Sequence, residues 1–398
     1  MWNDLLQLGL IGSEENKGLT RTALSESDLE ARKWFETKAK EFDIQVRTDQ
    51  SFNQIAIIPC RKSTSKICAV GSHLDTVPNG GMFDGALGVV AGLECARTIL
   101  ENKIDLSMNF EVINFCDEEA AYNAGTIGSR AMVGLLKAKE IFKKKSQNGI
   151  SFAEQLKRIG GDPLSVRRAK RNIRKFGYFL ELHIEQGKYL ENKNINIGVV
   201  TAISGIRRIL VTVTGNPEHA GTTPMELRND ALVKAAELIN VLPKWIIKRN
   251  RKMVGTVGRL SISPGAVNVI PGRCEFVVEL RSQINDDVEY ITWRINEFLK
   301  ARNGWKAEIV YDKKSQPLSM EVMKEIEKAA SDENRSFVRM SSGAGHDAQS
   351  FSAKGVPTGM IFIPCKNGIS HNYKETIKRE DAIAGCQVLM NTILRLSK

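Results

Sequence analysis

The five histidines of the chain lie in motifs rich in glycine, serine or acidic residues, and none lies within an apolar helical pattern. They are His73, His183, His219, His346 and His371. A buried structural histidine would be expected within such an apolar pattern, so this distribution favours a chemical role for the group. His73 and His183 each end a strand-like run, and His371 follows Gly368-Ile369-Ser370 in a predicted loop.

One glycine-rich stretch, residues 71–92, contains an imidazole and two carboxylates. It reads GSHLDTVPNGGMFDGALGVVAG and follows the apolar, strand-like run at 67–70. His73 and Asp75 stand at the strand end, and Asp84 stands just before a predicted helix. Gly80 and Gly81 permit a sharp return of the backbone, which we expect to bring Asp84 beside His73. The alternative is a strand-end histidine and a helix-capping aspartate without chemical roles.

Three consecutive acids, Asp117, Glu118 and Glu119, follow the strand-like run EVINFC. Acids packed together in this way repel one another unless a cation lies nearby, so a bound metal explains them economically. A surface acidic loop is the alternative. Beside a metal, one glutamate can act as a ligand while the other takes a proton from the attacking water.

These imidazole and carboxylate groups predict a metal centre without cysteine ligands. Such donors suit Zn²⁺, Mn²⁺, Co²⁺ or Ni²⁺. Three histidines and two carboxylates exceed the needs of one tetrahedral catalytic ion. Two ions about 3.5–4 Å apart that share a bridging carboxylate would use all of them.

Alternating strand and helix patterns surround these motifs. Strands are predicted at 55–59, 67–70, 110–115 and 177–183, and helices at 29–42, 89–100 and 128–145. Ser25 offers capping chemistry ahead of the first of these helices. The alternation predicts an α/β layer fold, in which ligands bind at the carboxyl ends of the strands.

The pattern changes after residue 205. Strands are predicted at 208–214, 255–263, 274–281 and 305–311, and helices at 230–241 and 288–301. This β-α-β-β-α-β order is typical of a ferredoxin-like α+β domain. The α/β pattern then resumes with a strand at 358–364 and a final helix at 379–396. We therefore expect an α/β catalytic domain at 1–204 and 316–398, interrupted by an inserted domain at 205–315.

Composition favours a globular protein of the cytoplasm. No apolar run approaches the roughly 18 residues that a membrane-spanning helix needs. The first residues carry acids early and lack a basic signal region. The seven cysteines are scattered and odd in number. This pattern indicates reduced thiols rather than a disulfide framework.

Much of the net charge of +11 lies between Lys137 and Lys175. A nucleic-acid surface is one interpretation of such a segment. The segment has neither interleaved aromatic residues nor a nucleic-acid motif, so we favour a solvated helical face and expect no nucleic-acid partner. A basic surface also favours small anionic substrates.

Longer motifs in the chain resemble the M20 metallopeptidase-type amidohydrolases, and in particular their hydantoinase/carbamoylase branch. The resemblance runs nearly end to end. It rests on GSHLDTVPNGGMFDG (71–85), DEE (117–119), GSRAMVG (128–134), ELHIEQG (181–187), HAGTTPM (219–225), SPGAVNVIPG (263–272) and GAGHDA (343–348). HIEQG and GAGHDA are specific to this branch among M20-like proteins.

The resemblance implies a di-metal aminopeptidase-like catalytic domain and a role for each matching residue. The first metal ion would be held by His73, Asp84 and His183, and the second by Asp84, Glu119 and His371. Glu118 would be the general base, and Asp75 would orient His73. The residues around the substrate would be Gln186, His219, Asn268, Arg281 and His346.

The implied reaction is hydrolysis of the ureido C–N bond of an N-carbamoyl-L-amino acid to the amino acid, ammonia and carbon dioxide. His219 would stabilise the oxyanion, and Arg281 with Asn268 would clamp the substrate carboxylate. The inserted domain would be a lid and the interface of a homodimer, through which His219 reaches the partner's site. An allantoate amidohydrolase is the closest alternative. An aminoacylase, a dipeptidase and a binding protein without activity are further alternatives.

Two local departures from the family pattern affect the expected substrate rather than the reaction class. The family usually has Glu-Glu-Gly-x-Arg-Phe, whereas this chain continues from Glu119 with Ala120-Ala121-Tyr122-Asn123. An early Asp-x-x-Gly-Asn motif appears as Asp49-Gln50-Ser51-Phe52-Asn53, without its glycine. No predicted metal ligand is lost in either motif.

Overall fold

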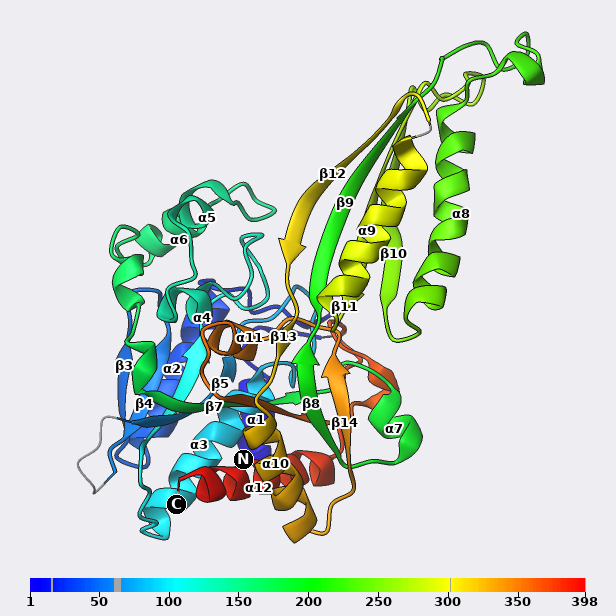
Figure 1. Cartoon of the computed structure of the whole chain (residues 1–398). Helices are drawn as coiled ribbons and strands as arrows, with labels where there is room; N and C mark the ends of the chain where they lie inside the picture. The colour runs from blue at the N-terminus through cyan, green and yellow to red at the C-terminus, as the bar shows by residue number, and fades with distance from the viewer. Residues whose placement is uncertain (16, 61–65, 301, 398) are drawn as a thin grey trace. The chain divides into compact units, whose positions relative to one another are not determined.

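The chain leaves one folding unit after Thr201 and returns to it at Leu318. The larger unit comprises Met1–Thr201 and Leu318–Lys398, and the inserted unit comprises Ala202–Pro317. The computed structural model describes residues 1–15, 17–60, 66–300 and 302–397. Figure 1 shows the path of the chain through both units.

A mixed sheet forms the centre of the larger unit. Its four central strands are β15 (Thr358–Ile363), β7 (Phe176–Ile184), β5 (Ile67–His73) and β6 (Asn109–Phe115), which run parallel to one another. The outer strands are β4 (Gln54–Ile58) and β3 (Gln45–Thr48) on one side and β8 (Ile197–Ile203), β13 (Gln316–Pro317) and β14 (Phe337–Ser342) on the other. Every residue of β5 and β15 is buried, as parallel strands covered on both faces require.

Helices cover both faces of this sheet. Leu180 and Leu182 of β7 belong to the main core with α3 (Ala86–Glu101), α10 (Met320–Asp332) and α12 (Arg379–Leu396). Phe179, one residue before Leu180, points to the opposite face and stacks on Phe351 of α11 (Ala348–Ser352), with ring centroids 4.0 Å apart. The alternation along β7 therefore buries both faces, and the predicted α/β layer fold is confirmed.

The N-terminal segment contains α1 (Trp2–Leu8), a short hairpin of β1 (Ser13–Glu14) and β2 (Gly18–Leu19), and α2 (Glu26–Lys40). The Ser25 side chain accepts the Asp28 N–H group and caps α2, as its sequence predicted. The single helix expected at 128–145 is instead two helices, α4 (Ile127–Met132) and α5 (Ala138–Lys143). Gly134 separates them with a φ of +75°, a left-handed conformation that a helix interior cannot contain.

The segment from residue 137 to residue 175, named the basic lobe, packs on a small second core that it shares with Leu24, Cys116 and Tyr122. It contains α5, α6 (Phe152–Arg158) and two 3₁₀ turns, η1 (Val166–Ala169) and η2 (Ile173–Lys175). Phe152 and Leu156 are buried, while most lysines and arginines are exposed. The lobe has thirteen lysine and arginine residues and three acids, so the rest of the chain is almost neutral.

The inserted unit has the ferredoxin-like order that its sequence predicted. It contains β9 (Gly205–Thr214), α8 (Ala231–Arg249), β10 (Val254–Ser263), β11 (Arg273–Ser282), α9 (Asn285–Lys300) and β12 (Trp305–Lys313). The strands form an antiparallel sheet in the order β10-β11-β9-β12. One face of it packs on α8 and α9 through Val211, Phe276, Leu238 and Ile291.

No helix in the described part of the chain combines the length and apolar character needed to cross a membrane. The seven cysteines, all within the described residues, form no disulfide bond.

Candidate metal and active site

The candidate residues lie at one edge of the sheet because β5, β6 and β7 run parallel to one another. His73 is the last residue of β5 and pairs in register with Phe115, the last residue of β6. The segment after β6, which contains Glu118 and Glu119, therefore starts directly beside His73. His183 lies near the end of β7, which runs in the same direction. The site stands at the carboxyl ends of the strands, as open α/β sheets predict.

The glycine-rich loop after β5 returns the chain to His73 at Asp84. Gly85, the next residue, has a φ of +67°, and a Cβ built on it would lie 2.4 Å from Cε1 of His73. Only glycine lets the start of α3 approach the imidazole this closely.

The two oxygens of Asp84 face different imidazoles. Oδ1 lies 3.2 Å from Nε2 of His183 and 3.7 Å from Nε2 of His73. Oδ2 lies 3.6 Å from Nε2 of His371, which is itself 3.3 Å from Oε1 of Glu119. Two donors about 2.0–2.1 Å from one tetrahedral ion lie ~3.3 Å apart, so these spacings suit two groups of metal ligands that share Asp84.

The second nitrogen of each buried imidazole contacts the main chain. Nδ1 of His73 lies 2.9 Å from the carbonyl oxygen of Asp75, and Nδ1 of His183 lies 2.9 Å from that of Ile184. A hydrogen bond of this kind fixes the tautomer with its lone pair on Nε2, the atom that binds a metal ion. In this structure Nε2 of His183 accepts the Gly85 N–H group at 3.2 Å.

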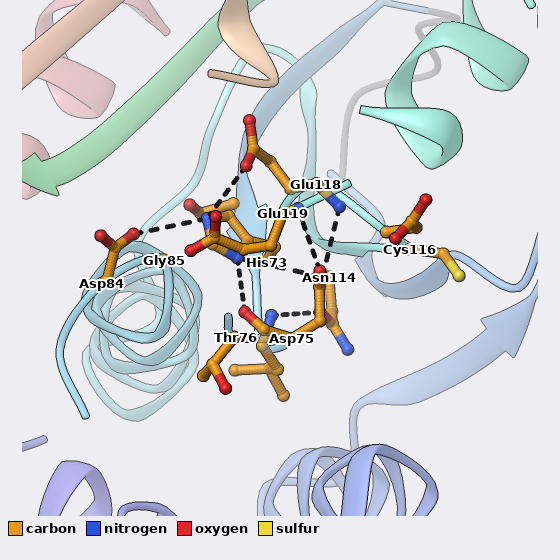
Figure 2. A network of polar contacts seen from close by, with 12 residues as sticks. His73, Asp75, Thr76, Asp84, Gly85, Asn114, Cys116, Glu118 and Glu119 are labelled. Atoms are coloured by element: carbon orange, nitrogen blue, oxygen red, sulfur yellow. Dashed lines mark hydrogen bonds and ion pairs between the residues drawn. The ribbon is translucent and has the colours of Figure 1, made fainter. Parts of the chain in front are cut away.

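The Asp75 side chain differs from its expected role. Its carboxylate is 3.9 Å from Nδ1 of His73, so the main-chain carbonyl makes the contact instead. The carboxylate accepts the main-chain N–H groups of Glu118 at 3.4 Å and Glu119 at 3.1 Å, as Figure 2 shows. Asp75 therefore positions the acidic loop.

The electrostatics of the site also fit a bound cation. Burial raises the pKa of Glu118 well above its usual value, and the carboxylates of Asp347 and Glu119 add to the effect. Burial alone would lower the pKa of His183, but Asp84 outweighs it and raises the pKa to about 9. A hydrogen bond to Glu119 raises the pKa of His371 to about 9. Divalent cations would take the place of these protons and stabilise the cluster of carboxylates and imidazoles.

Two polar side chains contact Asp84 on its Oδ2 side. Gln186 donates from Nε2 at 2.7 Å, and Ser370 donates from Oγ at 2.6 Å. Gln186 was predicted to contact substrate, and the structure places it on this predicted metal ligand. Ser370 was not predicted, although its place next to His371 is a signal that the sequence contains.

His346 lies beside His183, with ring centroids 4.6 Å apart in an edge-to-face arrangement. Its Nε2 shares a 2.8 Å hydrogen bond with the Ser342 hydroxyl. Glu181 is a further buried acid that sequence reasoning missed, and it accepts hydrogen bonds from Ser72 and from the Ala348 N–H group. The spacing Glu181-x-His183 on a strand places both side chains on the same face.

The other predicted substrate residues lie in the inserted unit. His219 is exposed and forms an isolated bridge with Val269, and the Ala220 N–H group donates to the Asn268 carbonyl at 2.9 Å. His219 and Asn268 are thus neighbours, near the Arg273 end of β11. Arg281 lies near the other end of that strand. At about 3.3 Å per residue, it is roughly 26 Å from Arg273 along β11. The joint clamp expected from Arg281 and Asn268 is therefore not formed within one inserted unit.

A model of the peptidase family M20/M25/M40 matches residues 69–395. The chain belongs to this family. Its match begins in β5 and ends in α12, so it includes all the predicted metal ligands.

Relatives of known name place this M20 protein in the hydantoinase/carbamoylase branch. The chain is 36% identical to the N-carbamoyl-L-amino acid amidohydrolase of Geobacillus stearothermophilus over 404 residues, covering 100% of this chain and 98% of that protein. It is 30% identical to the allantoate amidohydrolase of Bacillus subtilis (strain 168), covering 98% and 95%. The structure of a hydantoinase/carbamoylase family amidase from Burkholderia multivorans matches with a TM-score of 0.91 at 30% identity, covering 100% and 97%. The predicted resemblance is confirmed, and the M20 protein is an amidohydrolase that acts on C–N bonds.

At both departures of this M20 chain from the family pattern, a residue other than glycine adopts a left-handed backbone conformation that favours glycine. Ala120 and Phe52 occupy positions where the family has glycine, and both have positive φ, 60° and 69°. Phe52 lies against Arg32, whose guanidinium is 5.2 Å from the ring centroid. Tyr122, at the position of the family's arginine, is buried and donates from its hydroxyl to the Ala23 carbonyl at 2.9 Å. The wall beside the acidic loop is therefore uncharged at this position.

Proposed function

We propose that this amidohydrolase hydrolyses the ureido C–N bond of an N-carbamoyl-L-amino acid, giving the amino acid, ammonia and carbon dioxide. One observation carries the proposal. The residues around Asp84 are all present in a chain that is 36% identical, over its whole length, to an N-carbamoyl-L-amino acid amidohydrolase. The free thiols favour a reducing compartment, the cytoplasm, for this reaction.

Two divalent cations, Zn²⁺, Mn²⁺, Co²⁺ or Ni²⁺, are the proposed cofactors. His73, Asp84 and His183 would hold one, and Asp84, Glu119 and His371 the other. When bound, the ions supply electrophilic activation of the substrate carbonyl and an acidified water.

Glu118 is the proposed general base. Its Oε2 lies 3.9 Å from Nε2 of His73, within the site but outside both groups of candidate ligands. A raised pKa brings a carboxylate closer to the value at which it exchanges protons efficiently with water near neutral pH. Glu118 would take a proton from the attacking water and deliver it to the leaving nitrogen.

His219 is proposed to stabilise the oxyanion, and Arg281 to bind the substrate carboxylate. Gln186, Asn268 and His346 would complete the substrate contacts. His219 and Arg281 lie near opposite ends of the inserted sheet, so one small substrate can meet both only if they come from different copies of the chain. We therefore propose a homodimer in which the inserted domain, residues 205–315, acts as lid and interface.

The exposed edge of the inserted sheet supports this homodimer. β10 is an edge strand, and its side chains Val254, Leu260 and Ile262 are exposed by 57%, 44% and 38%. A long edge strand with exposed apolar residues is a surface that pairs with another chain.

The test is substrate hydrolysis by protein loaded with Mn²⁺ or Co²⁺, measured as ammonia release from the ureido compounds and as release of the free amino acid from the N-acetyl compounds. N-carbamoyl-L-amino acids, N-carbamoyl-β-alanine, allantoate and N-acetyl-L-amino acids would be compared. The highest kcat/KM on an N-carbamoyl-L-amino acid is expected. Activity only on the N-acetyl compounds would contradict the proposal.

Allantoate is the second candidate substrate, because the chain is 30% identical to an allantoate amidohydrolase over 98% of its length. It carries a ureido group that the same residues would hydrolyse. Preference for allantoate in the comparison would keep the roles of Glu118 and the metal ligands and replace the proposed substrate.

A further inference from the structure

Glu375 joins the two loops that carry Asp84 and His371. It lies four residues after His371, in the connection between β15 and α12. Its Oε1 accepts the main-chain N–H groups of Phe83 at 2.9 Å and Asp84 at 3.0 Å. None of the predicted roles above includes this residue.

The fold makes room for Glu375 at a specific glycine. A Cβ built on Gly81 would lie 2.2 Å from Cδ of Glu375, a distance that no packing tolerates. The second glycine of the Gly80-Gly81 pair is therefore needed for the Glu375 side chain to reach Asp84. Glu375 itself is 5% exposed, and within the described residues its Oε2 has no hydrogen-bond partner. A carboxylate buried at this cost is unusual for a purely structural contact.

The same loop also contacts Asp84 on its side chain. Ser370 donates to Oδ2, whereas Glu375 accepts the main-chain N–H group. Asp84 is thus bound from both sides by residues 370–375, and His371 lies between them. A shift of residues 370–375 relative to Asp84 would change the distance between Oδ2 of Asp84 and Nε2 of His371, which is 3.6 Å.

We propose that Glu375 is a positioning residue that sets the separation of Asp84 and His371 and thereby determines occupancy of the metal site formed by Asp84, Glu119 and His371. The inference rests on the two metal sites of the proposed function, and not on the identity of the substrate. Residues that orient metal ligands typically change metal affinity by about 10- to 100-fold when replaced.

Metal binding to Glu375→Ala and Glu375→Gln tests the proposal, measured by calorimetry with Mn²⁺ and by elemental analysis after dialysis. Glu375→Ala is expected to retain one ion firmly and to bind the second at least about tenfold more weakly. Glu375→Gln keeps an acceptor oxygen and is expected to restore most of the affinity. Glu154→Ala is the matched control, because Glu154 accepts the Ser151 N–H group in the basic lobe.

Gly81→Ala supplies an independent arm of the test. The added methyl group displaces Glu375, so the single variant should lose the second ion as Glu375→Ala does. The double variant Gly81→Ala/Glu375→Ala should be no worse than either single variant, since the vacated space accepts the methyl group. Circular dichroism of each metal-free variant confirms the fold.

Two unchanged metal affinities in a folded Glu375→Ala variant would overturn the proposal, and so would a wild-type protein that binds fewer than two ions. Failure of the proposed function is a separate result. A wild-type protein that binds two ions but hydrolyses no ureido compound would refute the substrate assignment, while the calorimetry would still decide the role of Glu375.

Discussion

The carboxylate of Asp75 accepts the main-chain N–H group of Glu119 at 3.1 Å. This contact ties Asp75, two residues after the end of β5, to the acidic loop after β6, and it fixes where Glu118 and Glu119 can lie. The predicted general base and one predicted metal ligand therefore depend on an acid that contacts neither substrate nor metal in the proposed arrangement.

Asp75→Asn is expected to lower kcat about 10- to 100-fold with a smaller change in KM. The amide keeps one acceptor oxygen but turns an NH₂ group toward the N–H groups of the loop, which displaces it. Steady-state kinetics on the preferred substrate measures the change. Thr76→Val, one residue later, is a control outside the acidic loop, and equal losses in the two variants would refute the specific role of Asp75.

Glu118→Gln is expected to lower kcat by about 10²- to 10⁴-fold because the amide cannot accept the proton of the attacking water. Both metal ions should remain bound, since Glu118 lies outside the predicted ligand groups. Glu119→Gln, by contrast, should weaken binding of one ion. Elemental analysis of both variants separates the two roles, and loss of metal from Glu118→Gln would reassign it as a ligand.

Metal binding should release protons. The pKa values of His183 and His371 are raised to about 9 without metal, so both imidazoles are protonated near neutral pH and must lose that proton to bind an ion. Metal affinity is therefore expected to rise with pH up to about 9. Calorimetry in buffers of different ionisation enthalpy measures the protons released. A pH-independent affinity would contradict the ligand assignments.

The stability of the metal-free protein should fall as pH rises. Burial raises the pKa of Asp347 to about 8 and that of Glu375 to about 7, so the folded state holds protons that the unfolded state has lost. A raised folded-state pKa contributes stability at low pH and loses it as pH increases from about 4 to about 8. Thermal unfolding across this range in the presence of a chelator measures the trend, and the added metal should flatten it.

Mixed dimers test the separation of His219 and Arg281. If each site takes these residues from different copies, a dimer of one His219→Ala and one Arg281→Ala chain contains one site with both residues intact. Mixing the two inactive variants should then restore activity, up to half that of a wild-type dimer in each mixed dimer. Absence of any restoration, with subunit exchange verified by differently tagged chains, would place both residues in one chain's site.

The sequence predicted the grouping of His73, Asp84, Glu119, His183 and His371 because each follows a motif at a strand end, and parallel strands bring such ends together. The structure brings these five side chains together. The contacts of Ser370 and Glu375 with Asp84 could not be predicted in this way. They depend on how a loop near the end of the chain packs against one near its beginning, and no local pattern encodes that packing.

The outer strands and the inserted unit were predicted to different extents. β8 and β14 were not predicted. β14 is short and mostly half-exposed, so its pattern is weak, whereas β8 is apolar and almost fully buried and its pattern is that of a strand. The inserted unit's β-α-β-β-α-β order followed from periodicity alone. The separation of Asn268 and Arg281 also follows from chain order, because Asn268 precedes the strand predicted at 274–281 and Arg281 ends it.

The basic lobe holds nearly all of the net positive charge of the chain in one segment of the larger unit. On a negatively charged resin or bead, the protein will therefore adsorb in one preferred orientation, with the lobe against the surface. Adsorption will weaken steeply with salt, because exposed charges are screened within about 10 Å at 0.1 M ionic strength. An immobilised preparation of this enzyme would thus be oriented without any chemical coupling.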